Sequence, residues 1–329
     1  MIYYIPLEHI DNRYTTHLDR DILHYLTENK KDFKRIYPHI ESKDIEIKKG
    51  SFLDAPTTIE FKSMQLAEIA RFFNYDLIKD GDEFFFSDIW FPGIESLAYL
   101  KYFCKKDIKL KGILHAGSFT DTDFVRDMER WAKNFEDIIF DIFDEIYVAS
   151  EFIKNDVIKK RIVNPEKIKV TPFQLDYEVT HHIKTDKEFN VIFNGRNVDE
   201  KQPWLLRELE TECRKQFGVL NLKNVNFINT QKLNLTKKEY YDLIGKSKVV
   251  VSFALQENFG FGINECVLAG CTPVVPNRLV YPEFYDSPYL YNTIYDCAYK
   301  VVDALMGNLK APLVDKRMID SSCFKTWFI

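Results

Sequence analysis

Short apolar runs rich in β-branched and aromatic residues alternate along this chain with longer segments in which apolar residues recur at helical spacing. This alternation is typical of βαβ units, in which parallel strands are covered by the helices that connect them. In the first half, the pattern predicts strands at Tyr3–Leu7, Glu83–Ile89, Gly112–His115 and Glu145–Ala149. It predicts helices at Thr16–Glu28, Thr58–Phe73, Ile94–Cys104, Thr120–Phe143 and Glu151–Lys160, the last of them capped by Ser150.

The alternation continues in the second half, which begins near Lys169. Pro203 suits the first turn of a helix that continues to Phe217, and Thr236 with Glu239 forms a capping-box pattern at the start of another helix. Strands are predicted at Lys169–Pro172, Val191–Asn194, Val225–Ile228, Lys248–Ala254 and Thr272–Val275, with a further helix at Ile263–Ala269.

The length of 329 residues exceeds that of a typical single domain and favours two sequential α/β domains. We expect an N-terminal Rossmann-like domain over residues 1–172 and a C-terminal one over residues 173–310. The connection is placed between Pro172 and Asn190, where polar residues show no clear periodicity. Residues 311–329 end on aromatic side chains that are costly to expose, so we expect this tail to pack back on the body, with the N-terminal domain as one docking surface.

Composition and charge exclude few classes of protein. The net charge of -5 argues against a surface wholly dedicated to nucleic acid, although it is compatible with a local basic groove. The six cysteines are scattered without a CxxC pair, which favours reduced thiols and a cytoplasmic location. Neither a signal-peptide pattern nor an apolar run of about 20 residues is present, so we expect no membrane association.

The stretch from Ser252 to Pro282 is the best candidate for chemistry. A predicted strand leads into a turn that contains Gly260 and Gly262, and a helix follows. Backbone amides at a helix N-terminus attract anions, and glycine lets a ligand approach the backbone closely. Glu257 precedes the turn and Glu265 lies one turn into the helix, where its carboxylate can accept hydrogen bonds from ribose hydroxyls.

Glu257 and Glu265 are separated by seven residues, and the run Ala269–Val275 reads AGCTPVV. This arrangement resembles the EX7E donor-binding segment of retaining GT-B glycosyltransferases, and Pro276–Glu283 is most similar to the tRNA-queuosine mannosyltransferase group. The resemblance covers about half of the chain. It implies an α/β GT-B fold with two Rossmann-like domains facing across a cleft, and a nucleotide-sugar held by Gly195, Asn258, Phe259, Gly260, Phe261, Gly262 and Glu265.

A second element, Gly195-Arg196 followed by Lys201, is similar to the G-R-x4-K element of the same family. The resemblance implies that Arg196 and Lys201 stabilise the departing diphosphate while Glu257 faces the sugar, without a metal or a cofactor. Taken alone, such a pair of cations is more often found on a solvated surface, and the neighbouring glutamate motif is what favours the donor site. His181 and His182 have no carboxylate or cysteine at ligand spacing, so no metal site is predicted.

The acceptor is expected to bind to the first domain. His115 is a candidate to contact the transferred sugar, with core packing as its alternative, and the loop Glu8–Thr16 follows the first strand as the family's acceptor loop does. That loop lacks the family's Gly-Gly pair. The acceptor-binding candidates are Asn12, Arg13, Tyr14, Asp121 and Asp123, and the two aspartates also suit the start of the long helix.

Size and composition look like those of bacteriophage enzymes that attach glucose or arabinose to hydroxymethylated cytosine in DNA. These enzymes reach a base that is either flipped from the helix or exposed in it. DNA is therefore our first expectation for the acceptor, in a host cytoplasm, with a UDP-sugar favoured over a GDP-sugar as donor. A tRNA base and a glycan are alternative acceptors. A domain that only binds a nucleotide is an alternative to catalysis, and nothing in the sequence predicts the oligomeric state.

Overall fold

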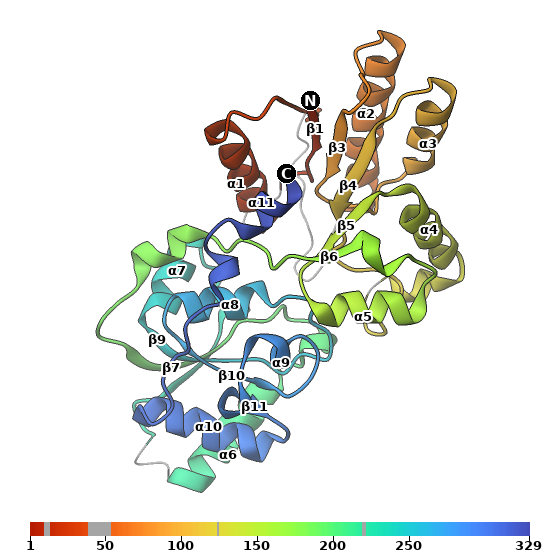
Figure 1. The fold of residues 1–329 in the computed structure, drawn as a ribbon. Coiled ribbons are helices and arrows are strands. Elements are labelled where there is room, and N and C mark those ends of the chain that lie inside the picture. Colours follow the sequence, from red (N-terminus) through yellow and green to blue (C-terminus); the bar gives the residue numbers. More distant parts are fainter. Residues whose placement is uncertain (10–13, 39–53, 124, 219–221) are drawn as a thin grey trace. The chain divides into compact units, whose positions relative to one another are not determined.

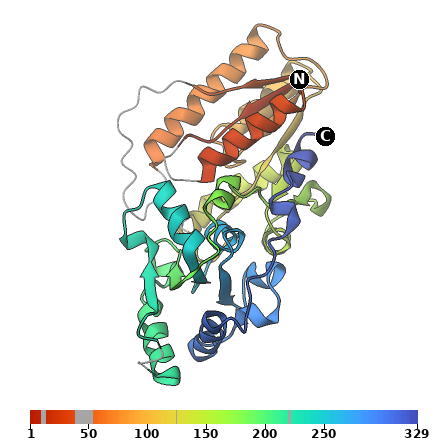
Figure 2. The same ribbon diagram turned by 90° about the vertical axis from the view of Figure 1, so that its left-hand side faces the viewer.

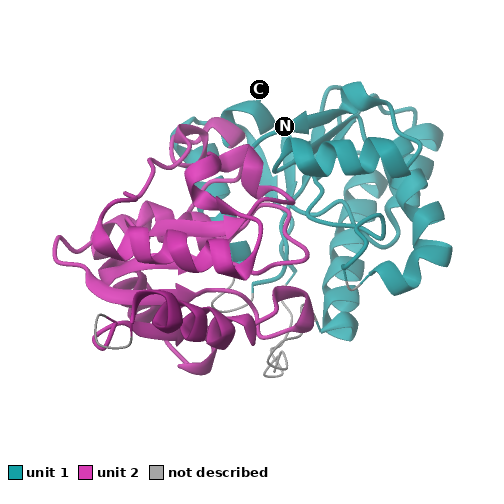
Figure 3. Cartoon of the chain, turned by 90° about the horizontal axis from the view of Figure 1, so that it is seen from below, with its two compact units in different colours: residues 1–171, 324–329 teal, residues 172–323 magenta. Residues whose placement is uncertain are grey.

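The computed structural model describes residues 1–9, 14–38, 54–123, 125–218 and 222–329. They form two units, each with its own parallel β-sheet. The first unit comprises Met1–Thr171 together with Phe324–Ile329, and the second comprises Pro172–Cys323, as coloured in Figure 3. None of the helices in these described ranges is long and apolar enough to cross a lipid bilayer.

The sheet of the first unit has six parallel strands in the order β2-β1-β3-β4-β5-β6 (Figure 1). The strands are β1 (Ile2–Ile5), β2 (Phe33–Arg35), β3 (Glu83–Phe86), β4 (Lys109–Ile113), β5 (Glu145–Val148) and β6 (Ile168–Val170). The connecting helices are α1 (Tyr14–Glu28), α2 (Ala55–Asn74), α3 (Ile94–Phe103), α4 (Glu129–Ile142) and α5 (Glu151–Lys160). In Figure 2, α1 in red and α2 in orange both run alongside these strands.

The caps of these helices follow from local sequence. Asp54 accepts a hydrogen bond from the amide of Thr57, and a proline occupies the first turn of α2. Ser150 accepts a hydrogen bond from the amide of Ile153 and so caps α5, as the sequence predicts. Both helices therefore begin where short polar side chains replace missing backbone partners.

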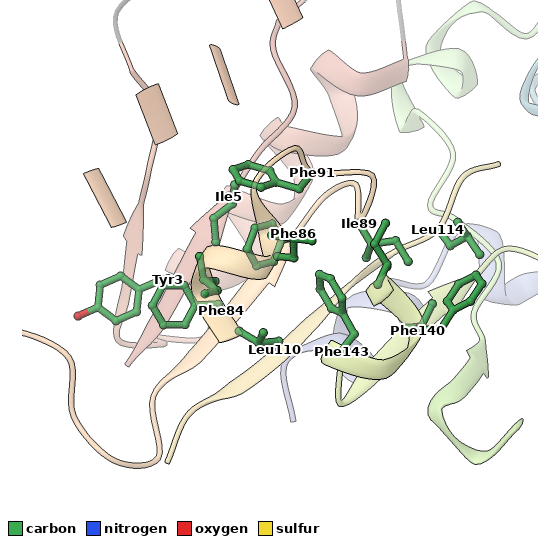
Figure 4. Packing of buried hydrophobic residues seen from close by; sticks show 14 of the residues in the cluster. Tyr3, Ile5, Phe84, Phe86, Ile89, Phe91, Leu110, Leu114, Phe140 and Phe143 are labelled. Carbon is green, nitrogen blue, oxygen red and sulfur yellow. The ribbon is translucent and has the colours of Figure 1, made fainter. Parts of the chain in front are cut away.

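Alternate residues of the strands point to opposite faces of the sheet. On one face the rings of Tyr3 and Phe84 stack with centroids 4.8 Å apart, and Phe72 of α2 lies 5.5 Å from Tyr3. Figure 4 shows how Phe86 and Phe143 extend this buried cluster. The face opposite carries Tyr4, Phe85 and Tyr147, all of them buried.

The segment Phe324–Ile329 completes the first unit. Trp327, at the end of α11 (Ser322–Trp327), is fully buried with its ring 5.4 Å from Phe85 and 6.0 Å from Tyr147. Its Nε1 atom donates to Thr171 Oγ1 at 2.9 Å, and Lys31 Nζ donates to the carbonyl of Phe328 at 2.7 Å. The aromatic tail is thus packed against the second face of the first sheet.

The sheet of the second unit has five parallel strands in the order β11-β10-β9-β7-β8. These are β7 (Glu188–Phe193), β8 (Asn226–Asn229), β9 (Ser247–Val251), β10 (Thr272–Pro276) and β11 (Leu290–Tyr291). The helices are α6 (Leu205–Phe217), α7 (Lys237–Lys246), α8 (Phe261–Leu268), α9 (Tyr281–Phe284) and α10 (Ile294–Met306). Buried residues of α6 and α10 pack with those of β7, β9 and β10 in one core.

Several elements differ from the prediction. The long helix expected over Thr120–Phe143 begins only at Glu129, because the residues before it form turns and a short 3-10 helix at Arg126–Met128. The strand predicted at Lys169–Pro172 is observed at Ile168–Val170, where it pairs with β5 as the sixth strand of the first sheet, inside the N-terminal domain predicted over residues 1–172. Five further elements were not predicted from the sequence: β2, β11, α9, α10 and α11.

In each sheet there is one point at which successive strands stop being added on one side and start being added on the other. From β1 the chain moves to β2 on one side and then returns to β3 on the other, and from β7 it moves to β8 and returns to β9. Open α/β sheets bind ligands outside the carboxyl ends of the strands at such reversals. The loops after β1 and β3, and those after β7 and β9, are therefore the places to look for functional side chains.

Candidate functional site

Lys201 lies in the loop after β7 and reaches the loop after β9. Its Nζ atom donates to the carbonyl of Gln256 and lies 3.2 Å from Glu257 Oε2. The Lys201 side chain is only 9% exposed. A buried ammonium group with one carboxylate partner is thus held at the strand reversal of the second unit, where an anionic ligand is expected.

Glu257 is held by the backbone as well as by Lys201. Its Oε1 atom accepts from the amide of Gly260 at 2.9 Å and from the amide of Asn258 at 3.2 Å. Burial alone would raise the pKa of Glu257, but the charge and hydrogen bond of Lys201, together with hydrogen bonds from the amides of Gly260 and Phe259, lower it below its usual value. Glu257 is therefore ionised at neutral pH.

Arg196 follows β7 on the same loop. Its Nη2 atom donates to Glu200 Oε1 at 2.5 Å, and the Arg196 side chain is 34% exposed. The carbonyl of Glu200 also accepts from the amide of Leu255 at 2.7 Å, which ties the loop after β7 to the loop after β9. Two cations, Arg196 and Lys201, are thus fixed within one pair of loops.

The glycines of the turn allow close packing between β7 and α8. Gly260 has a positive φ of 78°, a conformation that favours glycine. A Cβ atom on Gly262 would lie 2.6 Å from Asn194 Nδ2, which instead donates to the carbonyl of Gly262 at 2.9 Å. The first turn of α8 is thereby fixed beside the end of β7. The backbone amides of this first turn lack partners within the helix and can bind an anion.

Glu265 lies in α8 and is almost completely buried. Tyr240 donates its hydroxyl to Glu265 Oε2 at 3.2 Å, and Asn194 in turn donates to the Tyr240 hydroxyl at 2.6 Å. Burial raises the pKa of Glu265 to about 7, and the Tyr240 hydrogen bond only partly offsets this effect. Glu265 is therefore a carboxyl group poised to change its protonation near neutral pH.

The remaining predicted donor residues serve different purposes in the structure. The rings of Phe259 and Phe261 both pack against Phe173, at 5.3 and 5.6 Å between centroids, so these side chains stabilise the turn. Asn258 Oδ1 accepts from Gln256 Nε2 at 3.0 Å. Gly195 has no room for a side chain, because a Cβ atom there would lie 2.7 Å from the ring of Phe193.

His115 of the first unit follows β4, and both its ring nitrogens have partners. Nε2 donates to the carbonyl of Ser87 at 2.7 Å, and Nδ1 lies 3.1 Å from the hydroxyl of Tyr14. Burial lowers the pKa of His115, with the positive charge of Lys62 acting in the same direction. His115 is therefore neutral, and it holds Tyr14, another predicted acceptor residue, by a direct hydrogen bond.

The other acceptor candidates are placed differently. Asp121 lies 3.3 Å from Lys160 Nζ, and Asp123 Oδ1 accepts from the amide of Val125 at 3.1 Å. Neither aspartate begins α4, because that helix starts six residues after Asp123, so the interpretation as helix-start residues is wrong. Asn12 and Arg13 lie outside the described residues.

Candidate metal ligands are sparse in the ranges that the structure describes, where no group of three or more His, Cys, Asp or Glu side chains could hold an ion. His182 Nδ1 lies 2.8 Å from Asp242 Oδ1, which is a single carboxylate contact. All six cysteines are free thiols, and only Cys104 is exposed.

Two residues of the candidate site were missed by the sequence analysis. Glu200 holds Arg196, and its position four residues after that arginine is a local signal for such a pair. Tyr240 contacts Glu265 across 25 positions of sequence, so no local pattern could have identified it.

No protein-family profile matches this chain. The tRNA-queuosine alpha-mannosyltransferase of Drosophila melanogaster is 40% identical over 74 residues, which are 22% of this chain and 18% of that protein. The chain therefore matches less than a fifth of the length of this curated relative.

Solved structures are similar over nearly the whole chain. HepE of Anabaena, crystallised with UDP and glucose, is 12% identical with a TM-score of 0.59 over 99% of this chain and 95% of HepE. The lipopolysaccharide outer core galactosyltransferase WaaB is 12% identical, with a TM-score of 0.56 over 98% of this chain and 97% of WaaB. A glycosyltransferase from Rickettsia africae is 11% identical, with a TM-score of 0.55 over 99% of this chain and 98% of that protein. With its two parallel α/β sheets, the chain has the GT-B glycosyltransferase fold that the sequence predicts.

Proposed function

We propose that this chain is a glycosyltransferase that moves a sugar from a nucleotide-sugar, with UDP as the favoured nucleotide, to an acceptor hydroxyl. The observation that carries the proposal is the contact between Lys201 and Glu257 at the strand reversal of the second unit. A buried lysine paired with one carboxylate, beside a glycine turn and the start of a helix, is suited to receive a diphosphate. The complex of HepE with UDP and glucose supports this choice of donor.

In this reaction, negative charge develops on the departing nucleoside diphosphate. As the bond between sugar C1 and the phosphate oxygen breaks, its electron pair stays on the nucleoside diphosphate. Lys201 and Arg196 are preorganised cations that stabilise this growing negative charge, so a metal ion is not needed for that role. Ionised Glu257 faces the sugar, and Glu265 accepts hydrogen bonds from the ribose hydroxyls when it is deprotonated.

We further propose that the transfer retains the configuration at C1. The acceptor oxygen forms its bond to C1 on the face that the phosphate leaves, and its proton passes to the leaving phosphate. The EX7E spacing of Glu257 and Glu265 supports retention through the family resemblance. Turnover in the presence of a chelator, with the anomeric configuration of the product determined by NMR, tests both statements together.

For the acceptor, we propose a hydroxymethylated cytosine in bacteriophage DNA that receives a glucosyl or arabinosyl group. The support is the likeness in size and composition to such phage enzymes. A tRNA base is the second candidate, because the local identity of 40% is to a tRNA-queuosine mannosyltransferase. In both cases the acceptor group is carried by a modified nucleobase, which must be exposed in the nucleic acid or flipped out of it.

One assay discriminates among these acceptors and also tests for catalysis. The purified chain is incubated with UDP- and GDP-sugars and with hydroxymethylcytosine DNA, unmodified DNA, tRNA or glycans, and the added mass is determined. A hexose or pentose mass on the hydroxymethylated DNA alone is the expected result. Transfer to glycans only would exclude a nucleic-acid acceptor, and UDP binding without any transfer would favour a nucleotide-binding domain.

A further inference from the structure

The first unit contains a further histidine, His9, whose ring is held in place by a carboxylate. His9 follows β1, and its Nε2 atom lies 2.7 Å from Oδ2 of Asp19 on α1. The Asp19 side chain is 4% exposed, whereas that of His9 is 42% exposed. A buried carboxylate thus holds an imidazole that faces solvent.

Two groups contact Nε2 of His9 and require opposite roles of it. A carboxylate oxygen accepts and a guanidinium only donates, so the shorter contact, 2.7 Å to Asp19, favours a proton on Nε2. Arg35 Nη2 donates to the same Asp19 oxygen at 2.6 Å and lies 3.2 Å from His9 Nε2. Because Asp19 and Arg35 both contact Nε2, Nδ1 is the ring nitrogen that is left to face a ligand.

The His9 ring is oriented further by Tyr37, whose ring centroid lies 5.1 Å away and whose hydroxyl accepts from the His9 amide at 3.4 Å. An exposed imidazole fixed by two neighbours is preorganised to accept a hydrogen bond from a ligand.

The position of His9 in the fold also favours a ligand-binding role. It follows β1 at the strand reversal between β1 and β3, just as Arg196 and Lys201 follow β7 at the reversal between β7 and β9. The loop after β3 contributes Ser87, whose carbonyl accepts from His115, and Ser87 Oγ donates to the hydroxyl of Tyr4 on β1 at 3.2 Å. The carboxyl ends of β1, β3 and β4 thus carry a connected set of polar groups.

We propose that His9 binds the acceptor by taking a hydrogen bond on Nδ1 from an O–H or N–H group, and that Asp19 is the residue that positions it. This inference rests on the proposed function, because it names the side chain that recognises the acceptor of that reaction. A hydroxyl or an exocyclic amine of a nucleobase is the matching chemistry. The attacking hydroxyl still gives its proton to the leaving phosphate.

The first test needs no turnover. Nitrogen-15 NMR of the histidine side chains in the full chain is expected to show His9 with Nε2 protonated and Nδ1 unprotonated at neutral pH. Asp19→Asn offers an N–H group to the ring and is expected to weaken this preference. A His9 with its proton on Nδ1 in the wild-type chain would overturn the proposal.

The second test measures steady-state kinetics with hydroxymethylcytosine DNA as the probe. His9→Ala is expected to raise the KM for this DNA by about tenfold to a hundredfold, because a hydrogen bond made in a partly buried site is lost. His9→Asn keeps an acceptor atom near the position of Nδ1 and is expected to restore part of the loss, which a purely structural role would not allow. His24→Ala, at an exposed histidine of α1, is the matched control.

Failure of this inference and failure of the proposed function give different results. UDP binding is measured for every variant and is expected to stay unchanged, because His9 belongs to the first unit. If transfer to DNA occurs but His9→Ala leaves the KM unchanged, the role of His9 is disproved while the proposed function stands. If the DNA is not a substrate, the acceptor assignment fails, and the kinetics are repeated with the tRNA or glycan that is modified. If no acceptor is modified, the proposed transfer fails and the role of His9 fails with it.

Discussion

Lys201 and Glu257 are 56 positions apart in the sequence, yet their side chains meet at 3.2 Å where β7 and β9 end. The contact lowers the pKa of Glu257 against the effect of its burial. Within the part of the chain that the structure describes, Glu257 is the one carboxylate in ion-pair contact with the Lys201 ammonium. In the donor site that we propose, Glu257 is therefore an ionised carboxylate and Lys201 is a cation in a fixed position.

Replacing Lys201 by alanine is expected to lower kcat about 10²-fold, because a preorganised charge is lost where negative charge develops. The pKa of Glu257 should rise at the same time, so that the acidic limb of the pH-rate profile moves to higher pH. Lys215→Ala, at an exposed lysine of α6, serves as control. Equal rates for both variants would exclude Lys201 from the reaction.

Glu200 holds the Arg196 guanidinium at 2.5 Å and would compete with the donor for it if Arg196 binds the diphosphate as we propose. Glu200→Gln is expected to tighten UDP binding roughly two- to fivefold, the range set by partly exposed ion pairs. Isothermal titration calorimetry measures the effect. Glu210→Gln on α6 is a matched control, because Glu210 also pairs with an arginine four residues away at 2.8 Å. Weaker UDP binding by the Glu200 variant would contradict this account.

The raised pKa of Glu265, about 7, makes the folded chain hold a proton that the unfolded chain releases near pH 4.3. This contribution to the free energy of unfolding is complete below about pH 4.3 and is lost as the pH rises through 7. Glu265→Gln is therefore expected to be more stable than wild type by about 1–3 kcal/mol at pH 8, and equal at pH 4. Urea unfolding at the two pH values measures this difference, and a less stable variant at pH 8 would refute the assignment.

Trp327 anchors the segment Phe324–Ile329 to the first unit through Phe85, Tyr147 and the hydroxyl of Thr171. Trp327→Ala is expected to cost about 3–5 kcal/mol of unfolding free energy, because a fully buried indole leaves a cavity. Trp204→Ala is the control, since that side chain is about half exposed. Similar midpoints for both variants in urea would show that the segment does not stabilise the first unit.

Local sequence was sufficient wherever a structural feature depends on neighbouring residues. The capping box of Thr236 and Glu239 is confirmed in both of its hydrogen bonds, and so is the Ser150 cap of α5. Glu257, the turn and Glu265 fall within one strand-turn-helix unit, so their spacing alone could place them.

Contacts between distant residues could not be predicted in this way. Tyr240 meets Glu265 from another helix, and Asp19 holds His9 through a fold that no spacing rule encodes. The start of α4 was misplaced because Asp123 accepts from the Val125 amide in a local turn that competes with the helix. Helix α10 was overlooked even though Cys297, Val301 and Leu305 recur every four residues, which is a usable signal.

The packing of Trp327 also determines when the first unit can finish folding. The hydrogen bond between Lys31 and Phe328 joins residues 297 positions apart, and that between Trp327 and Thr171 spans 156 positions. Contacts of such high sequence separation form late, because the chain entropy of closing the loop between them must be overcome first. One sheet face of the first unit therefore stays partly uncovered until the whole second unit has been synthesised, and a fragment cut after Thr171 is expected to aggregate where the full chain does not.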